Sequence, residues 1–367
     1  MSLKTTLERY LPLIEAELRE PFTPPHPHLA PFYGMMQYHL GWLDESFAPT
    51  TGGAGKRVRP IMCLLTCQAT GGDPAQALPA AAALELVHNF SLVHDDIEDQ
   101  SDLRRGRPTV WKVWGVPQAI NAGDGLFALA HLTMQCLAAR GVLPRRVLTA
   151  LEILDQACLA LTKGQYLDLS FETHLDVDVA QYLSMIRGKT AALFGAAAQL
   201  GALVAGSDPA SIARYRRFGE NLGLAFQIVD DVLGIWGDPQ VTGKPSADDI
   251  RQRKKTLPIV RALEEEQKHE AKGLRDIYQR ETIGEEAVEA ALKILENLGA
   301  RHYAEAMAND YYQQALAELD ATGMENEAQD DLRELEELGL VEVTAERVRL
   351  TPRGRLHGNE VFERFLP

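Results

Sequence analysis

Two clusters of carboxylates are the residues of this sequence best suited to chemistry. The run His94-Asp95-Asp96-Ile97-Glu98-Asp99 follows an apolar stretch that is typical of a buried helix. Asp95 and Asp99 are four residues apart, so both carboxylates lie on one helix face. Hard divalent cations such as Mg²⁺ take carboxylate, phosphate and water oxygens. Because acidic side chains at a helix C-terminus oppose the helix dipole, the pattern favours a bound cation over a solvated helix end.

A second acidic pair, Asp230-Asp231, also ends an apolar helical stretch, and Gln227 precedes it by one turn. Lys244, Asp249 and Lys254 follow within 25 residues. Neither cluster is specific alone. Together they predict metal ions that bridge a polyanionic ligand between two helix ends.

Basic side chains supply the complement. A glycine-rich segment, Gly55-Lys56-Arg57-Val58-Arg59-Pro60, precedes a predicted helix, and Arg104-Arg105-Gly106-Arg107-Pro108 follows the first acidic cluster. Arginine can bind phosphate in a bidentate manner, whereas lysine acts as a point charge. We expect phosphate contacts from Lys56, Arg59, Arg104 and Arg105, and solvated side chains for Arg57, Arg107 and Lys255. Two basic groups beside two metal sites indicate two diphosphates.

Helices must position these residues. The chain has 367 residues, of which 46% are apolar, and apolar residues recur at three- and four-residue spacing from residue 3 to 321. We predict helices there and no alternating strand. Asp73-Pro74 and Asp208-Pro209 each predict a helix start. Stretches 77–99 and 186–205 are apolar on most faces, which indicates the interior of a large bundle. The proline-rich segment 21–27 should join two leading helices.

The end of the chain has another pattern. Residues 329–338 predict a charged amphipathic helix, residues 340–343 and 347–350 alternate as two short strands, and residues 360–366 predict a last helix. We therefore predict two units, a helical domain over 1–321 and a winged-helix-like appendage (helix, hairpin, helix) over 322–367.

Composition excludes several classes of protein. A net charge of −15 argues against a nucleic-acid binder and against an anionic membrane surface. The four arginines of the tail (Arg347, Arg349, Arg353, Arg355) follow a strongly acidic helix, so we expect the tail to pack on the bundle or on a second copy. Four cysteines without a paired C-x-x-C pattern indicate a reduced, cytoplasmic protein. We find no apolar run of the ~20 residues that a membrane span needs.

In this order the motifs resemble those of the trans-isoprenyl (polyprenyl) diphosphate synthases, over roughly residues 50–260. The resemblance is carried by 55–60, by 95–99 with Arg104-Arg105-Gly106, and by Gly188-Lys189-Thr190. It continues in Phe226-Gln227-Ile228-Val229-Asp230-Asp231 and in Lys254-Lys255-Thr256-Leu257-Pro258.

The resemblance implies an all-α bundle around a central cavity, dependence on Mg²⁺, and a homodimer. It implies a prenyltransferase that condenses isopentenyl diphosphate head-to-tail with an allylic diphosphate. The roles that it implies are Mg²⁺ ligands (Asp95, Asp99, Asp230), allylic diphosphate contacts (Arg104, Lys189, Lys244, Lys254), isopentenyl diphosphate contacts (Gly55, Lys56, Arg59, His88, Arg105) and residues at the reacting centre (Thr190, Gln227).

Two positions bear on activity and product. The second aspartate motif of the family has a third aspartate where this chain has Gly234, which puts a metal role for that position in doubt. In the family, bulk just before the first motif sets product length. Phe90 and Ser91 stand five and four residues before Asp95. We expect the Phe90 ring to close the bottom of the cavity that holds the growing chain. Geranylgeranyl diphosphate is then the expected main product, with farnesyl diphosphate next.

Two other functions stay open. A non-catalytic partner subunit of a heteromeric prenyl synthase would explain Gly234. A terpene cyclase would share the aspartates and Mg²⁺, but it would not need Lys56, Arg59 and Arg105. The tail also weakly resembles the C-terminal segment of coproporphyrinogen-oxidase-like radical enzymes. It lacks their cluster-binding cysteines, so we expect no such chemistry.

Overall fold

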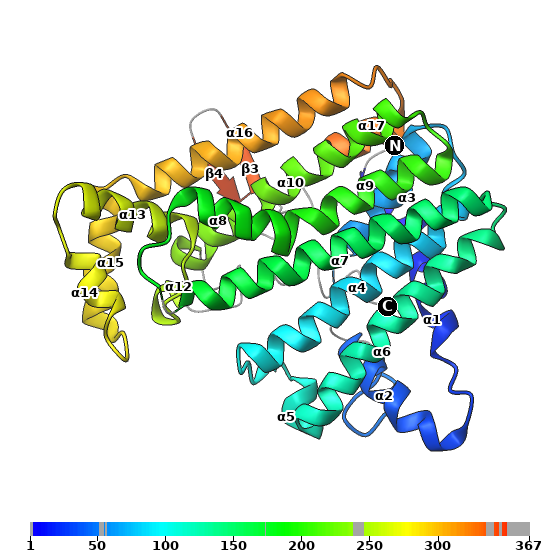
Figure 1. Cartoon of the computed structure of the whole chain (residues 1–367), viewed down its shortest axis with the longest axis horizontal. Coiled ribbons are helices and arrows are strands. Elements are labelled where there is room, and N and C mark those ends of the chain that lie inside the picture. The colour runs from blue at the N-terminus through cyan, green and yellow to red at the C-terminus, as the bar shows by residue number, and fades with distance from the viewer. Residues whose placement is uncertain are drawn as a thin grey trace.

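Long helices make up almost the whole described chain, as the apolar spacing predicts (Figure 1). The computed structural model describes residues 3–50, 55, 57–172, 174–237, 246–334, 341–344 and 347–350. Lys56 and Lys244, both predicted to bind diphosphate, lie outside the described residues, and so does the predicted helix 360–366.

The long elements follow in chain order. The helices are α1 (Leu3–Arg19), α2 (Ala30–His39), α3 (Val58–Ala69), α4 (Pro74–Glu98), α5 (Val110–Trp114), α6 (Val116–Gln135), α7 (Pro144–Glu172), α8 (Val179–Ile186), α9 (Ala192–Ala205), α10 (Pro209–Trp236), α12 (Asp248–Arg251), α13 (Leu257–Lys268), α14 (Gly273–Tyr278), α15 (Glu285–Asn297), α16 (Ala300–Asp320) and α17 (Glu327–Arg333). Shorter pieces are the 3₁₀ turns η1 (Glu20–Phe22), η2 (Pro27–Leu29) and η3 (Cys136–Ala138), the π-helical turn η4 (Arg187–Ala191), and the strands β1 (Leu103–Arg104), β2 (Arg107–Pro108), β3 (Val341–Thr344) and β4 (Arg347–Leu350).

Local sequence explains where the main helices begin. Asp73 accepts a hydrogen bond from the Ala75 N–H at the start of α4, and Asp208 does the same for α10. Proline follows each aspartate at the first helical position, where its missing N–H is not needed. Both predicted helix starts are therefore confirmed. The proline-rich segment joins α1 to α2 through η1 and η2, as expected.

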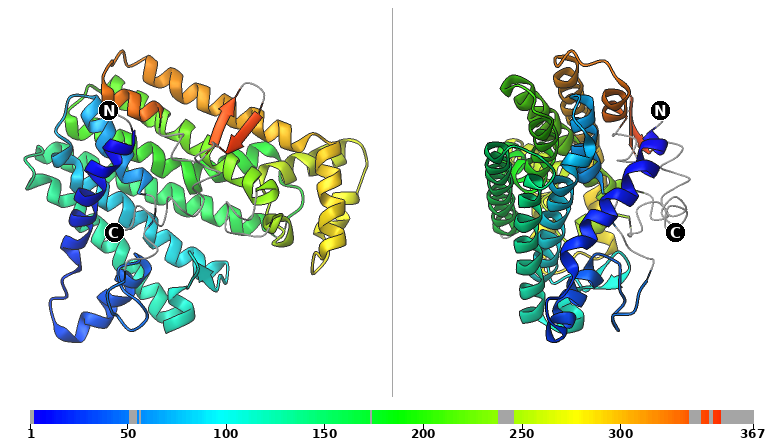
Figure 2. Two further views of the ribbon diagram at one scale, coloured as in Figure 1. Left: turned by 180° about the vertical axis from the view of Figure 1, so that it is seen from behind. Right: turned by 90° about the vertical axis from the view of Figure 1, so that its right-hand side faces the viewer.

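The core lies where α3, α4, α9 and α10 pack together. In Figure 1, α6 and α7 cover the near face of these helices, and Figure 2 shows α1 crossing the far face. Helices α12 to α15 gather at one end of the bundle around a smaller apolar cluster that includes Ile250, Leu274 and Leu295. This arrangement leaves the C-terminal ends of α4 and α10 to carry the two aspartate clusters.

The stretch Val179–Ala205, which spans α8, η4 and α9, is long and apolar enough to cross a membrane. Within the bundle, 72% of its most apolar window is buried. Its apolar character is therefore accounted for by packing against α7, α3 and α10.

The expectation of no strand before residue 321 is wrong at one place. Strands β1 and β2 pair antiparallel, with Leu103 opposite Pro108 and Arg104 opposite Arg107. The two turn residues, Arg105 and Gly106, have φ of 53° and 72°, as a tight type I′ hairpin requires. Two-residue strands are too short for alternation to reveal them. The hairpin holds Arg104 and Arg105 side by side.

The second hairpin is confirmed, because β3 and β4 pair antiparallel with Val341 opposite Leu350. The preceding helix α17 begins two residues earlier than predicted. It is tied to the bundle: Tyr215 donates a hydrogen bond to Gln329, and Thr6 donates one to Asp331. Leu332 is fully buried there. Residues up to 334 therefore pack with the helices, and a separate unit beyond them stays a prediction.

Candidate active site

The first aspartate cluster ends α4 and faces cations from other elements. Asp96 is buried and accepts a 2.8 Å hydrogen bond from Arg104 Nε. Burial raises the pKa of Asp95 to about 6, against the opposing charge of Lys189, and neighbouring Asp99 raises it further. A carboxylate with a raised pKa at the end of a helix gains stability from an added cation.

The two aspartates of the second cluster differ in their surroundings: Asp231 is buried and hydrogen-bonded, whereas Asp230 is exposed. Asp231 is buried and accepts hydrogen bonds from the Tyr182 hydroxyl, the Leu257 N–H (2.9 Å) and Gln227 Nε2 (3.1 Å). It therefore caps α13 and holds α8 against α10. Asp230 is exposed on the neighbouring face, which leaves its carboxylate available to a cation.

The carboxylate of Asp249 lies next to Gly234, the position at which the family motif has its third aspartate. Gly234 lies one turn after Asp230, so a side chain there would point to the same helix face. A Cβ atom at Gly234 would lie 1.9 Å from Asp249 Oδ2 and 2.6 Å from its Cγ. The Asp249 carboxylate, which is largely buried, therefore fills the space in which a side chain at 234 would begin. Lys254 Nζ lies 3.9 Å from Asp249 Oδ1.

The π-helical turn η4 carries Lys189 and Thr190 to the same region. Lys189 Nζ lies 2.6 Å from Asp168 Oδ2 on α7. Burial acts to lower the pKa of Lys189, but the carboxylates of Asp168 and Asp95 outweigh it and raise the pKa. Thr190 donates a 2.7 Å hydrogen bond to Gln227 on α10. The structure thus brings together the side chains predicted for the reacting centre.

A second cationic group lies around α3 and the β1–β2 hairpin. A Cβ at Gly55 would meet Arg105 Nη2 at 2.8 Å, so the guanidinium lies closely against this backbone and would have to shift for a larger residue. Burial lowers the pKa of Arg105 to about 10 and that of Arg59 also to about 10. The Arg59 guanidinium lies over the Phe194 ring, 4.6 Å from its centroid. His88 on α4 is partly exposed, and desolvation together with the charges of Arg59 and Arg105 lowers its pKa well below 6.5.

The expectation of solvated side chains is wrong for Arg57, Arg107 and Lys255. Arg57 is 2% exposed and lies between Glu15 and Glu85, each 2.7 Å away. Arg107 packs over the Tyr38 ring and donates to the Leu43 carbonyl at 2.7 Å. Lys255 is 8% exposed, and burial lowers its pKa to about 8. Each has a structural partner far away in sequence, which local spacing does not reveal.

Glu85 is a residue that sequence reasoning missed. It is 2% exposed, accepts from Arg57 at 2.7 Å and from Asn89 Nδ2 at 2.9 Å, and lies one turn before His88. Burial acts to raise the pKa of Glu85, but Arg57 outweighs it and holds the pKa below the usual range. An acidic residue in an apolar stretch, at helical spacing from His88, is the signal that could have found it.

Phe90 packs toward α6, where its ring meets Phe127 with the centroids 5.1 Å apart, and it also lies edge-on to His94 one turn later on α4, at 5.6 Å. Ser91 is buried, and its hydroxyl donates to the His88 carbonyl. The aromatic expected just before the aspartates is therefore one of a pair.

The residues that could hold Mg²⁺ are Asp95, Asp99 and Asp230, and Asp249 lies against Gly234, one turn after Asp230. Within the described ranges, three His, Cys, Asp or Glu side chains do not converge on one point as a complete metal site. These donors suit a cation that takes its other ligands from phosphate oxygens and water, which is the usual habit of Mg²⁺. With two cationic groups nearby, the arrangement can bind and neutralise diphosphates.

Comparison with known proteins agrees with this geometry. A family model described as polyprenyl synthetase matches residues 41–295. A geranylgeranyl diphosphate synthase of Mycobacterium tuberculosis is 45% identical over 295 residues, which cover 79% of this chain and 81% of the relative. A (2E,6E)-farnesyl diphosphate synthase of Mycobacterium bovis is 38% identical over 327 residues, 88% of this chain and 89% of the relative.

A solved structure of a polyprenyl synthetase from Streptomyces coelicolor A3(2) has the same fold. Its TM-score is 0.82 at 36% identity, and the match covers 92% of this chain and 98% of that one.

Proposed function

Because this chain belongs to the polyprenyl synthetase family of prenyl-transferring enzymes, we propose that it makes geranylgeranyl diphosphate by adding isopentenyl diphosphate to a shorter allylic diphosphate. Two observations support the geranylgeranyl product. Phe90 and Phe127 form an aromatic pair beside the first aspartates, and the relative with 45% identity is a geranylgeranyl diphosphate synthase. Farnesyl diphosphate is the alternative product, after the relative with 38% identity.

The observation that carries the two-substrate reaction is the presence of two separate groups of cationic side chains. One group, with Lys189 and Lys254, accompanies the aspartates. The other, with Arg59 and Arg105, lies behind Gly55, where burial lowers both arginine pKa values. A bound anion stabilises cationic side chains that are gathered in one place and partly removed from water. A terpene cyclase needs one diphosphate site, so the second group favours condensation.

The proposed chemistry follows from these side chains. Mg²⁺ held by Asp95, Asp99 and Asp230 would neutralise the allylic diphosphate, which is otherwise a poor leaving group. Lys189, Lys254 and Arg104 hold that diphosphate as its carbon–oxygen bond breaks. The double bond of isopentenyl diphosphate, positioned by the second cationic group, then forms the new carbon–carbon bond.

Forming the new carbon–carbon bond leaves a carbocation on the former isopentenyl group. This cation loses a proton, which the released diphosphate accepts. An apolar surrounding protects the allylic cation from water. Thr190 and Gln227, held to each other by a 2.7 Å hydrogen bond, would border the reacting carbons.

The place of Asp249 weakens the case for a non-catalytic subunit. That alternative rested on the absent carboxylate at Gly234. Asp249 fills the corresponding space, and we propose that it serves in place of the third aspartate.

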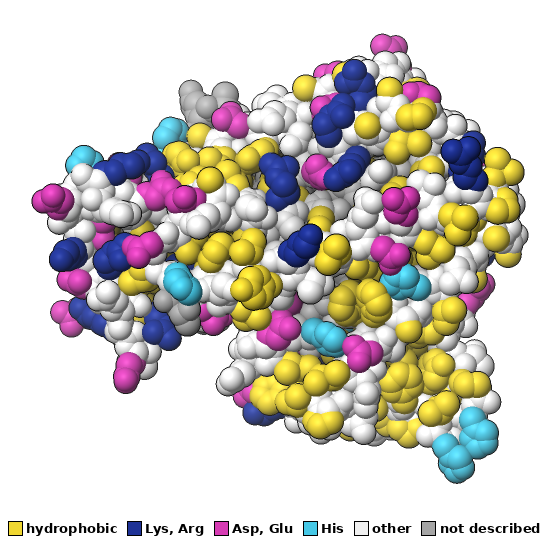
Figure 3. Space-filling model, in the orientation of Figure 1, with side chains coloured by type: hydrophobic (Ala, Val, Ile, Leu, Met, Phe, Trp, Pro, Cys, Tyr) yellow, Lys and Arg dark blue, Asp and Glu magenta, His cyan; other side chains and the backbone are white. Residues whose placement is uncertain are grey.

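Homodimer formation and a cytoplasmic location are further parts of the proposal. Large apolar side chains are exposed along α6 and α7 (Ile120, Phe127, Leu132, Leu148, Leu159 and Tyr166). Figure 3 shows yellow side chains over this face. Exposed large apolar side chains gathered on one face favour association with a second copy. Light scattering after size exclusion tests the dimer, and a monomer at micromolar concentration would contradict it.

Product analysis tests the function. The purified protein is incubated with isopentenyl diphosphate, Mg²⁺ and, separately, dimethylallyl, geranyl or farnesyl diphosphate, and products are identified by mass spectrometry. We expect elongation that stops at four isoprene units and is abolished by EDTA. A different length refutes the proposed product, and a folded protein without elongation refutes the reaction.

A further inference from the structure

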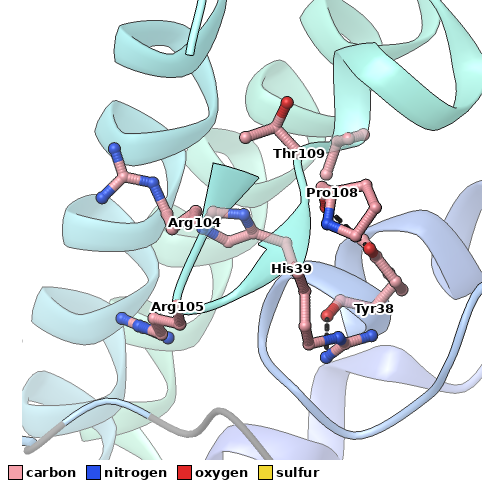
Figure 4. Close-up of a pocket in the computed structure, with 8 residues that line it drawn as sticks. Tyr38, His39, Arg104, Arg105, Pro108 and Thr109 are labelled. Carbon is pink, nitrogen blue, oxygen red and sulfur yellow. Dashed lines mark hydrogen bonds between the residues drawn. The ribbon is translucent and has the colours of Figure 1, made fainter. Parts of the chain in front are cut away.

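The C-terminal end of α2 is fastened to the β1–β2 hairpin that carries Arg104 and Arg105. The Tyr38 hydroxyl donates a 2.6 Å hydrogen bond to the Pro108 carbonyl. In return, Arg107 lies over the Tyr38 ring at 4.1 Å and donates to the Tyr38 carbonyl. Figure 4 shows these groups around one small pocket. Helix α2 and the hairpin thus form one packed unit.

His39, the last residue of α2, lies inside this unit. Its Nε2 atom is buried and has no hydrogen-bond partner among the described residues. The pocket beside it has a volume of about 20 Å³ and is lined by His39, Arg104, Arg105 and Thr109, among others. A polar cavity of this size can hold one ordered water molecule.

The His39 ring is uncharged at neutral pH. Burial lowers its pKa well below 6.5, and the charges of Arg105, Arg104 and His88 lower it further. A neutral imidazole offers one donor and one acceptor. It can therefore accept a hydrogen bond in a cationic pocket without adding charge, which lysine or arginine could not do.

We propose that His39 is a positioning residue for the diphosphate of isopentenyl diphosphate, acting through one water that joins its Nε2 to the guanidinium of Arg105. This inference rests on the proposed function, since Arg105 is there assigned to that substrate. An unpartnered buried nitrogen is costly, and a water held between it and arginine donors satisfies it. The water would aim Arg105 at Gly55, against which its guanidinium already lies.

Three substitutions separate this role from simple packing. A glutamine amide at position 39 reaches the place of Nε2, an asparagine amide reaches only Nδ1, and leucine offers neither. We expect His39→Gln to keep the KM for isopentenyl diphosphate. His39→Asn and His39→Leu should raise it about three- to tenfold, the loss of one hydrogen bond, with the KM for the allylic substrate unchanged. His28→Leu, at an exposed histidine of η2, is the matched control and should change neither constant.

The outcomes are distinguishable. Equal KM values in all three variants, or a loss of activity that follows melting temperature alone, would overturn the positioning role. If the wild-type protein does not elongate at all, the proposed function fails, and calorimetric titration with inorganic diphosphate then tests His39 by itself. Weaker binding in His39→Leu but not in His39→Gln supports the inference, and equal binding overturns it.

Discussion

Gly164 on α7 provides a sharp test of how the reacting centre is held. Its Cα packs directly on the π-helical turn η4, and a Cβ there would lie 2.1 Å from the Lys189 nitrogen. Ordinary contact begins at 3.4 Å, so Gly164→Ala requires the two backbones to separate by 1.3 Å. The contact atom is backbone and cannot rotate away. Lys189, which must also keep Asp168 within 2.6 Å, would move with η4.

The cost follows from this displacement. Overpacking of a core costs about 1–3 kcal/mol, which corresponds to a fall in melting temperature of about 2–10 °C. A misplacement of about 1 Å in a catalytic group can reduce the rate by about a hundredfold. We therefore expect a folded variant with lower melting temperature and a kcat reduced by one to two orders of magnitude, measured by differential scanning fluorimetry and by diphosphate release.

Gly284→Ala is the control for this change. Gly284 precedes α15 with φ of −82°, and an added Cβ would meet nothing within 4 Å. As a helix N-cap it should cost no more than ~1 kcal/mol and leave kcat unchanged. Wild-type stability and wild-type kcat in Gly164→Ala would refute the argument that this close approach sets the position of Lys189.

Four other outcomes are expected. Phe90→Ala should lengthen the main product by at least one isoprene unit, as measured by mass spectrometry. An unchanged product length would refute the idea that the Phe90 ring limits chain growth. Asp249→Ala should raise the Mg²⁺ concentration needed for half-maximal activity about tenfold. Adding Gly234→Asp to that variant should return the Mg²⁺ requirement toward the wild-type value. If the requirement stays high, the two positions are not equivalent. Because His39, whose Nε2 is buried, stays neutral while the unfolded chain gains a proton below about pH 6.5, the free energy of unfolding should fall as pH falls, by up to about 1.4 kcal/mol per unit. Urea unfolding at pH 7.0 and 5.5 should show a shallower fall in His39→Gln, and equal slopes would contradict it. Truncation after residue 334 should leave melting temperature and turnover intact, while truncation after residue 321, which removes the buried face of α17, should lower both; equal effects would count against a structural role for α17.

Local chemistry was readable without the fold. The helical spacing of Asp95 and Asp99, the proline-led starts of α4 and α10, and the alternation of β3 and β4 each depend on residues within a few positions of one another. Such patterns are periodic, so they survive in the sequence alone. The family resemblance rests on the same short segments, which is why the all-α bundle was predicted.

Long-range partners were not readable. Arg57 looked like any loop arginine, yet Glu15 and Glu85 enclose it from 42 and 28 residues away. The β1–β2 hairpin was missed because its strands are only two residues long.

The sequence by itself determined the elements and the chemical types at their ends, because helix periodicity and capping are local. Only the tertiary structure decided which charges are neutralised and which space is filled. It placed the Asp249 carboxylate in the space next to Gly234, and it placed His39 in the pocket that is also lined by Arg104 and Arg105. Burial and electrostatics depend on neighbours from the whole chain, and no spacing along the sequence encodes them.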